Sequence, residues 1–197
     1  MIKLYWCPRT RAFRALWLLE EAAVAYERVR IDLRDETSRA NPDFRRASPL
    51  GKVPALEDGA VRLNDSGAMC LYIADAYPQM QLAPPIGHPD RGAYLQWVLF
   101  TNSSIEPAMI EKMANIQPNP RAHGWGGFDA MLGTLRAGLE RGPWILGERF
   151  CAADVLLGSA IHFLNLFKLI GPEPVLDAYV ARCFERPAAQ RARATET

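Results

Sequence analysis

Two short stretches decide the fold of this chain: SPLGKVPAL at residues 48–56 and NDSGAM at residues 64–69. In the first, Val53-Pro54 opens a strand-like run that ends at Asp58-Gly59, a dipeptide typical of the two-residue loops of β-hairpins. In the second, Asp65-Ser66 stands where an N-cap opens a helix. Together they predict a strand, a tight turn, a second strand at residues 60–63 and a helix from residue 67 to about residue 77.

The residues upstream predict a βαβ unit. Residues 2–6 form a short apolar run typical of a buried strand, and Pro8 is suited to the first turn of a helix. From residue 11 the apolar residues recur with helical spacing, and residues 26–33 alternate as a strand does. Two strands joined by a helix indicate a parallel crossover. Residues 34–43 read as a loop or a short helix.

Everything after residue 88 reads as helical, with helices predicted at 92–112, 128–141, 152–169 and 175–186. Residues 84–89, PPIGHP, are rich in helix-breaking residues, and the clearest boundary in the chain lies near residues 79–87. We therefore expect an α/β domain of the order βαβ-ββα at residues 1–78, a linker at residues 79–87, and an all-α domain at residues 88–197.

Composition excludes several classes of function. The 197 residues carry a net charge of +1, which gives no broad attraction to nucleic acid or to an anionic membrane. The four cysteines and three histidines are scattered without the spacing of a metal site, so we expect no metal. Cys70, Cys151 and Cys183 read as buried free thiols. No apolar signal or membrane-spanning run is visible, which favours a cytoplasmic protein.

The two opening stretches each allow two interpretations. If the Val53-Pro54 bond is cis, the backbone of Val53 turns outward and could pair with an extended peptide; otherwise Pro54 is an ordinary trans residue in a turn. Asp65-Ser66 lies at a helix N-terminus, where Ser66 could hold a carboxylate and Asp65 an ammonium group of the same ligand. Alternatively, it is a plain helix cap.

These stretches carry a family resemblance. The βαβ unit, residues 50–56 and residues 64–73 resemble the glutathione-binding, thioredoxin-like domain of bacterial-type cytosolic glutathione transferases. The helical remainder is similar to the C-terminal domain of that family. The run FCAADV at residues 150–155 is similar to its helix-capping segment, in which Asp154 would bind back to residue 151.

The resemblance implies roles for individual residues. Val53 would bind the cysteinyl backbone of glutathione, with Pro54 cis. Asp65 and Ser66 would hold the γ-glutamyl amine and carboxylate, and Lys52 would lie near the glycyl end. Two positions depart from the family pattern: Asp65 stands where Glu is usual, and Cys151 stands where Ser or Thr is usual. A thiol is a poor acceptor, so the second departure weakens the capping box.

The resemblance also points to the loop after the first strand as the place where the thiol is activated. Cys7-Pro8 is similar to the omega-type and glutaredoxin-like pattern, in which the cysteine forms a mixed disulfide; Arg9 and Arg11 would then favour its thiolate. Alternatively, Thr10 or the loop amides would stabilise the thiolate of bound glutathione. In a third interpretation, Cys7 is buried and has no role. The alternation of the strand places Tyr5 in the core.

We therefore expect a cytoplasmic, homodimeric glutathione transferase with a role in detoxification. It would use glutathione as a co-substrate, with no other cofactor, against a small electrophile. The alternatives are a Cys7-dependent thiol-disulfide or deglutathionylating enzyme and a non-catalytic binding protein of the same fold. Exposed Met80 and Trp97 would support a dimer. Candidates for the electrophile pocket are Asn102, Ser103, Glu106, Met109, Met113 and Trp125.

Overall fold

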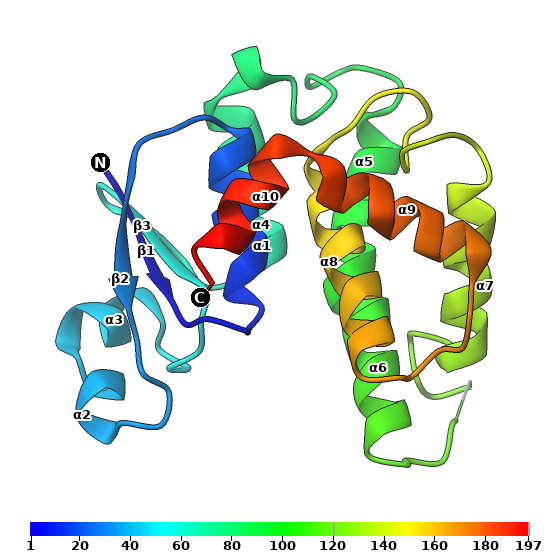
Figure 1. Ribbon diagram of the computed structural model, residues 1–197, viewed down its shortest axis with the longest axis horizontal. Coiled ribbons are helices and arrows are strands. Elements are labelled where there is room, and N and C mark those ends of the chain that lie inside the picture. Colours follow the sequence, from blue (N-terminus) through cyan, green and yellow to red (C-terminus); the bar gives the residue numbers. More distant parts are fainter. Residues whose placement is uncertain (120, 197) are drawn as a thin grey trace. The chain divides into compact units, whose positions relative to one another are not determined.

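The computed structural model describes residues 1–119 and 121–196 and contains two compact units (Figure 1). Residues Met1–Leu82 and Arg186–Thr197 make up the first unit, and Ala83–Glu185 make up the second. No helix in the described part of the chain is long and apolar enough to cross a membrane.

The first unit is built on a mixed four-stranded sheet of order β2-β1-β3-β4. β1 pairs in parallel with β2 and antiparallel with β3, and β3 pairs antiparallel with β4. The strands are β1 (Ile2–Trp6), β2 (Tyr26–Arg30), β3 (Ala55–Asp58) and β4 (Val61–Leu63). The predicted βαβ-ββα order and the thioredoxin-like fold are therefore confirmed.

The helices of this unit are α1 (Ala12–Glu21), α2 (Glu36–Arg39), α3 (Pro42–Ala47), α4 (Ser66–Ala76), the 3-10 turn η1 (Pro78–Met80) and α10 (Pro187–Ala194). α2 lies within residues 34–43, for which the sequence predicts a loop or a short helix, whereas α3 begins there and continues to Ala47. Their starts are fixed by Asp35 and Asn41, whose side chains accept backbone N–H groups of the first turn.

Burial explains why α1 has so little polar surface. Ala12–Leu19 are all buried, because α1 contacts β1, α4 and α10. Elsewhere on the sheet, Tyr5 packs against Phe44 with ring centroids 5.7 Å apart. The Tyr5 hydroxyl donates a hydrogen bond to Glu57 at 2.7 Å, and Tyr5 is only 1% exposed. Its predicted place in the core is confirmed.

The second unit is helical. It contains α5 (Arg91–Phe100), the π-helical segment η2 (Thr101–Ile105), α6 (Glu106–Met113), α7 (Phe128–Leu139), α8 (Ala152–Leu166) and α9 (Pro174–Glu185). The helix predicted at 92–112 is thus α5 and α6, joined by η2. The segment η2 widens the helix locally, which side-chain periodicity does not reveal.

Trp97 corrects one expectation. The sequence suggests an exposed apolar residue, but the Trp97 ring packs over Gly138 of α7, where an added Cβ would come within 2.5 Å of the indole. The ring also makes an edge-on contact with Phe100 at 5.2 Å. Trp97 is therefore part of the packing of the second unit, and Met80 is likewise partly buried within the first unit.

Asp154 anchors the start of α8. Its buried carboxylate accepts hydrogen bonds from the backbone N–H groups of Cys151 at 2.8 Å and Ile145 at 2.9 Å, and from the Tyr179 hydroxyl at 2.7 Å. The predicted tie from Asp154 to residue 151 is therefore present. The Cys151 thiol completes the capping box by facing the N–H of Asp154.

The C-terminal helix α10 groups with the first unit. Residues 186–197 fall in the predicted helical domain, yet α10 packs along α1 and groups with the first unit (Figure 1). The chain passes from the first unit to the second between residues 82 and 83, which lie inside the predicted linker. As domain boundaries, 1–78 and 88–197 stay a prediction.

Candidate functional site

Strand register brings the predicted site segments together at one end of the strands β1, β3 and β4, a region called the Cys7 edge. The antiparallel ladder between β1 and β3 pairs Tyr5 with Ala55, so Cys7, two residues after Tyr5, and Val53, two residues before Ala55, lie at the same end of the ladder. The ladder between β3 and β4 pairs Leu56 with Leu63, so Asp65 also comes to this edge. Because neighbouring strands lie about 4.8 Å apart, these residues converge around one small area.

The first segment presents an open backbone edge. The Val53-Pro54 peptide bond is cis, as the resemblance implied. Among the described residues, no hydrogen bond engages the N–H or C=O of Val53. Val53 is partly exposed while Pro54 is buried, so the segment offers one unpaired donor and one unpaired acceptor to an extended ligand.

The turn before Val53 is fixed by local hydrogen bonds. The Ser48 hydroxyl accepts the N–H of Lys52 at 2.9 Å and donates to its C=O at 2.8 Å, and Ser48 is fully buried. Gly51 has a φ of 64°, and a Cβ there would meet the Arg45 guanidinium at 2.2 Å. The positive φ favours glycine at this turn, and the guanidinium of Arg45 lies beside it, while the Lys52 side chain is exposed.

The second segment is a helix N-terminus. Asp65 is the N-cap of α4, and its Oδ1 accepts the N–H of Ala68 at 2.9 Å. Ser66 is the first residue of the helix and is 9% exposed. The capping role is therefore present. Asp65 is exposed, so its negative charge lies at the surface close to Val53. The backbone amides of the first turn of α4 carry partial positive charge beside it.

The third segment is the loop that joins β1 to α1. Cys7 is a free thiol and is partly exposed, whereas Cys70, Cys151 and Cys183 are free and buried, as predicted. The Thr10 hydroxyl donates to the C=O of Cys7 at 2.7 Å and accepts the N–H of Ala12 at 3.2 Å. Its single proton is thus used within the loop, and Thr10 acts here as a staple that sets the shape of the turn.

Cys70 lies one turn into α4 from Ser66, below the site. Burial raises the pKa of this thiol, the charge of Arg14 opposes the shift and the charge of Asp65 adds to it. Arg14 is itself 1% exposed and lies on α1. A buried guanidinium therefore contributes positive charge beneath the edge where the three segments meet.

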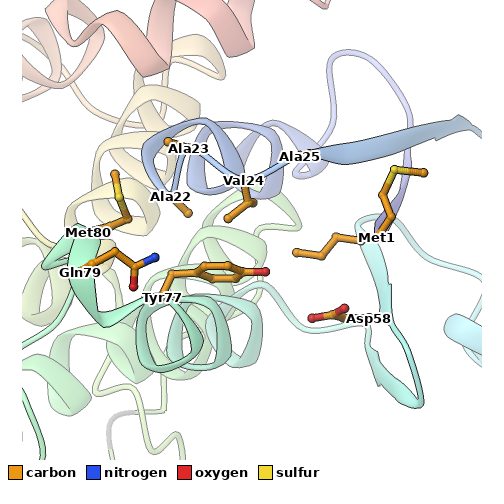
Figure 2. Close-up of a pocket in the computed structure, with 10 residues that line it drawn as sticks. Met1, Ala22, Ala23, Val24, Ala25, Asp58, Tyr77, Gln79 and Met80 are labelled. Carbon is orange, nitrogen blue, oxygen red and sulfur yellow. The ribbon is translucent and has the colours of Figure 1, made fainter.

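A separate pocket of about 410 Å³ lies at the opposite end of β1. Met1 and Ile2 line it together with Ala22–Ala25 after α1, Asp58, Gln79 and Met80, and Figure 2 shows the Tyr77 side chain extending toward Met1. Because Ile2 begins β1 and Cys7 follows its end, this pocket is distinct from the site at the Cys7 edge.

Within the second unit, two candidate pocket residues have other partners. Met109 is 2% exposed and belongs to the core. Trp125 donates its indole N–H to the buried carboxylate of Glu111 at 2.9 Å and stacks on His123, which contacts the same carboxylate. Asn102 and Glu106 are partly exposed, and Ser103 and Met113 are exposed.

Sequence reasoning missed two residues at the Cys7 edge. Arg45 lies against Gly51, six residues later in the chain, and no motif in the sequence marks that contact. Glu196 accepts the N–H of Arg9 at 3.1 Å from 187 positions away in the chain. No local pattern announces a contact of that range.

Comparison with known proteins places this geometry in a family. The glutathione S-transferase N-terminal domain matches residues 1–75. Glutathione S-transferase F10 of Arabidopsis thaliana is 32% identical over 175 residues, covering 81% of this chain and 76% of the relative. Disulfide-bond oxidoreductase YfcG of Escherichia coli is 26% identical, covering 98% of this chain and 94% of the relative.

Among solved structures, a sphingomonad glutathione S-transferase complexed with glutathione is 28% identical, has a TM-score of 0.80 and covers 98% of both chains. Similarity thus extends over the whole chain in sequence and in fold, and it includes the three segments at the Cys7 edge. This chain belongs to the glutathione S-transferase family.

Proposed function

We propose that this protein is a glutathione transferase, which binds glutathione at the Cys7 edge and promotes attack of its thiolate on a small electrophile. The observation that carries the proposal is the convergence of the unpaired Val53 backbone, the Asp65-Ser66 helix start and the loop at the start of α1. A γ-glutamyl tripeptide needs each of these three elements. The sphingomonad relative, solved with glutathione bound, supports the same ligand here.

The ends of the ligand would be held by charge. The Asp65 carboxylate suits the γ-glutamyl ammonium, and the hydroxyl and amide of Ser66 suit the neighbouring carboxylate. Val53 would pair with the cysteinyl backbone as one strand pairs with another. Lys52 and Arg45 would face the glycyl carboxylate. This arrangement leaves the sulfur directed toward the Cys7 loop.

At that loop, the thiolate of glutathione would be stabilised by the positive end of α1 and by the amides of its first turn. The proton leaves to water, and the sulfur lone pair forms the new bond to the electrophile as its leaving group departs. Thr10 enters the proposal as the residue that shapes the loop, because its hydroxyl proton is bound to the C=O of Cys7.

A second candidate function rests on the partly exposed Cys7 thiol. Its thiolate would attack the glutathione sulfur of a mixed disulfide, forming a disulfide bond between Cys7 and glutathione and releasing the other thiolate. A second glutathione would then attack that bond, releasing glutathione disulfide and restoring Cys7. The similarity to a protein named disulfide-bond oxidoreductase supports this alternative.

The substitution Cys7→Ser separates the two chemistries. We expect the variant to retain conjugation of chlorodinitrobenzene within about threefold of the wild type, because loop amides and the helix terminus remain. Turnover of β-hydroxyethyl disulfide should fall if Cys7 carries exchange. Loss of conjugation in a folded variant would refute the proposed mechanism. Absence of both activities and of retention on immobilised glutathione in the wild type would favour a non-catalytic protein.

Ligand recognition is tested by Asp65→Asn. Asparagine is as good an N-cap as aspartate, so α4 is preserved while the charge is removed. We expect KM for glutathione to rise about tenfold, the effect of losing one charge-assisted contact. Asp35→Asn is the matched control, because Asp35 caps α2 in the same way. An unchanged KM in the Asp65 variant would overturn the assignment of the γ-glutamyl site.

We further propose a cytoplasmic homodimer that works in detoxification. Support for the dimer comes from an open groove of about 510 Å³ along α4, lined by Ala68, Leu71, Tyr72, Asp75 and Ala76. An apolar groove with one carboxylate suits burial against a second subunit. Light scattering of wild type and Leu71→Glu checks this, with a shift to monomer expected in the variant.

A further inference from the structure

A carboxylate that follows α10 reaches the loop at which the proposed thiol chemistry takes place. Glu196 accepts the backbone N–H of Arg9 through Oε1 at 3.1 Å. Arg9 has a φ of 58°, a left-handed conformation that is uncommon for a residue with a side chain. Such a conformation persists only when its surroundings hold it in place.

The helix that precedes Glu196 is fastened to α1 at its other end. Arg186 forms a two-pronged ion pair with Glu21 at 2.6 and 2.7 Å, and Arg191 bonds to Glu20 at 2.7 Å. These contacts lie at the C-terminal end of α1, whereas Glu196 acts before its N-terminal end. α10 therefore runs the length of α1, as Figure 1 shows.

Packing between these contacts is close. Ala188, Ala189 and Ala192 are buried, and such small side chains let two helices approach each other. Burial raises the pKa of Glu196, while the Arg9 N–H and the charges of Arg9 and Arg193 oppose the shift. The carboxylate is thus drawn partly out of water and is met by the positive charge of two arginines.

We propose that Glu196 is a positioning residue of the thiol site: its carboxylate fixes Arg9, and through Arg9 the turn that presents Cys7 and the start of α1. The inference rests on the proposed function in placing thiol chemistry at this loop. Glu196 does not need to touch the substrate. It acts by holding the left-handed residue between Cys7 and Thr10.

The test compares Glu196→Ala with Glu196→Gln in the full chain. Alanine removes the acceptor, whereas the amide oxygen of glutamine can still accept the Arg9 N–H. With glutathione and chlorodinitrobenzene, Glu196→Ala should lower kcat about fivefold to tenfold, the rate change that one hydrogen bond of ordinary strength controls. KM for glutathione should stay unchanged, because Val53 and Asp65 are not altered. Glu196→Gln should restore kcat to within about twofold.

Two readouts do not depend on transferase activity. In Glu196→Ala, the Arg9 amide should exchange with solvent faster, and the rate of Cys7 alkylation by iodoacetamide should change. Glu140→Ala, which removes an exposed carboxylate of the second unit, is the control and should alter neither. If the wild type proves inactive with glutathione, the proposed function fails, but these two measurements still decide the inference. Unchanged amide exchange and alkylation in Glu196→Ala would overturn it.

Discussion

Replacing Thr10 by valine distinguishes two roles for this residue. Valine has nearly the same shape but no hydroxyl, so the substitution removes the bond to the C=O of Cys7 at 2.7 Å and the bond from the N–H of Ala12 at 3.2 Å. The role matters because the resemblance left open whether Thr10 itself stabilises the glutathione thiolate. In the structure its hydroxyl proton is directed to a backbone carbonyl instead.

The two roles predict different magnitudes. A staple at the start of a helix contributes about 1 kcal/mol, as N-cap residues do. Loss of a donor that contacts the developing negative charge slows turnover by about 10²-fold to 10³-fold. From the geometry we expect Thr10→Val to lower the free energy of unfolding by about 1 kcal/mol and to slow turnover by less than about tenfold.

The assay is urea unfolding together with steady-state conjugation of chlorodinitrobenzene at saturating glutathione. Thr10→Ser is the matched control, because it keeps the hydroxyl and should restore both quantities. Thr134→Val provides a second comparison, since Thr134 bonds a backbone carbonyl of α7 within the helix. If turnover by Thr10→Val slows by about 10²-fold or more while stability is unchanged, the structural role is refuted. Thr10 would then be assigned as a hydrogen-bond donor to the glutathione thiolate.

Three further predictions concern stability. Asp154→Ala should lower the free energy of unfolding by about 4 kcal/mol, because three buried donors lose their acceptor; Asp154→Asn should cost less, and equal losses in urea titrations would contradict this. Cys151→Ser should raise it by about 0.5 to 1 kcal/mol, since a hydroxyl accepts the capping N–H better than a thiol; a lower urea midpoint would speak against it. Burial acts to raise the pKa of Glu57, but hydrogen bonds from Tyr5 and Arg62 prevail and hold it below its usual value. The stability that Glu57 contributes is therefore present above the usual carboxyl pKa and lost as pH falls through the lower folded pKa. Acid unfolding followed by circular dichroism should show a shallower pH dependence in Glu57→Gln, and an identical profile would count against the pairing.

The sequence was sufficient for elements whose cause is local. Residues 2–6 are apolar, the Asp58-Gly59 turn is explicit, and Asp65 is a good N-cap, so β1, the hairpin and α4 can be predicted to within two residues. The candidate site could be predicted as well, because its residues lie at the ends of these same elements. Strand register then brings Cys7, Val53 and Asp65 together.

The remainder depends on contacts between residues far apart in the chain. α10 is short and polar on average, and the local signal for it is little more than Pro187 at its start. Its position is set by ion pairs with α1, 165 and 171 residues earlier. The partial burial of Trp97 is hard to foresee, because its ring packs over Gly138 and a glycine adds no apolar side chain to the helical pattern.

The grouping of α10 with the first unit has a consequence for biosynthesis. A ribosome that has finished residue 82 must still add the whole second unit before it reaches Arg186. At about 5 to 20 residues per second, α1 waits roughly 5 to 20 seconds for its last helical neighbour. During that interval the nascent first unit exposes apolar surface that α10 later covers. Slow translation through the second unit should therefore favour binding of the nascent chain by chaperones. The folded protein, in which α10 covers α1, should not bind them.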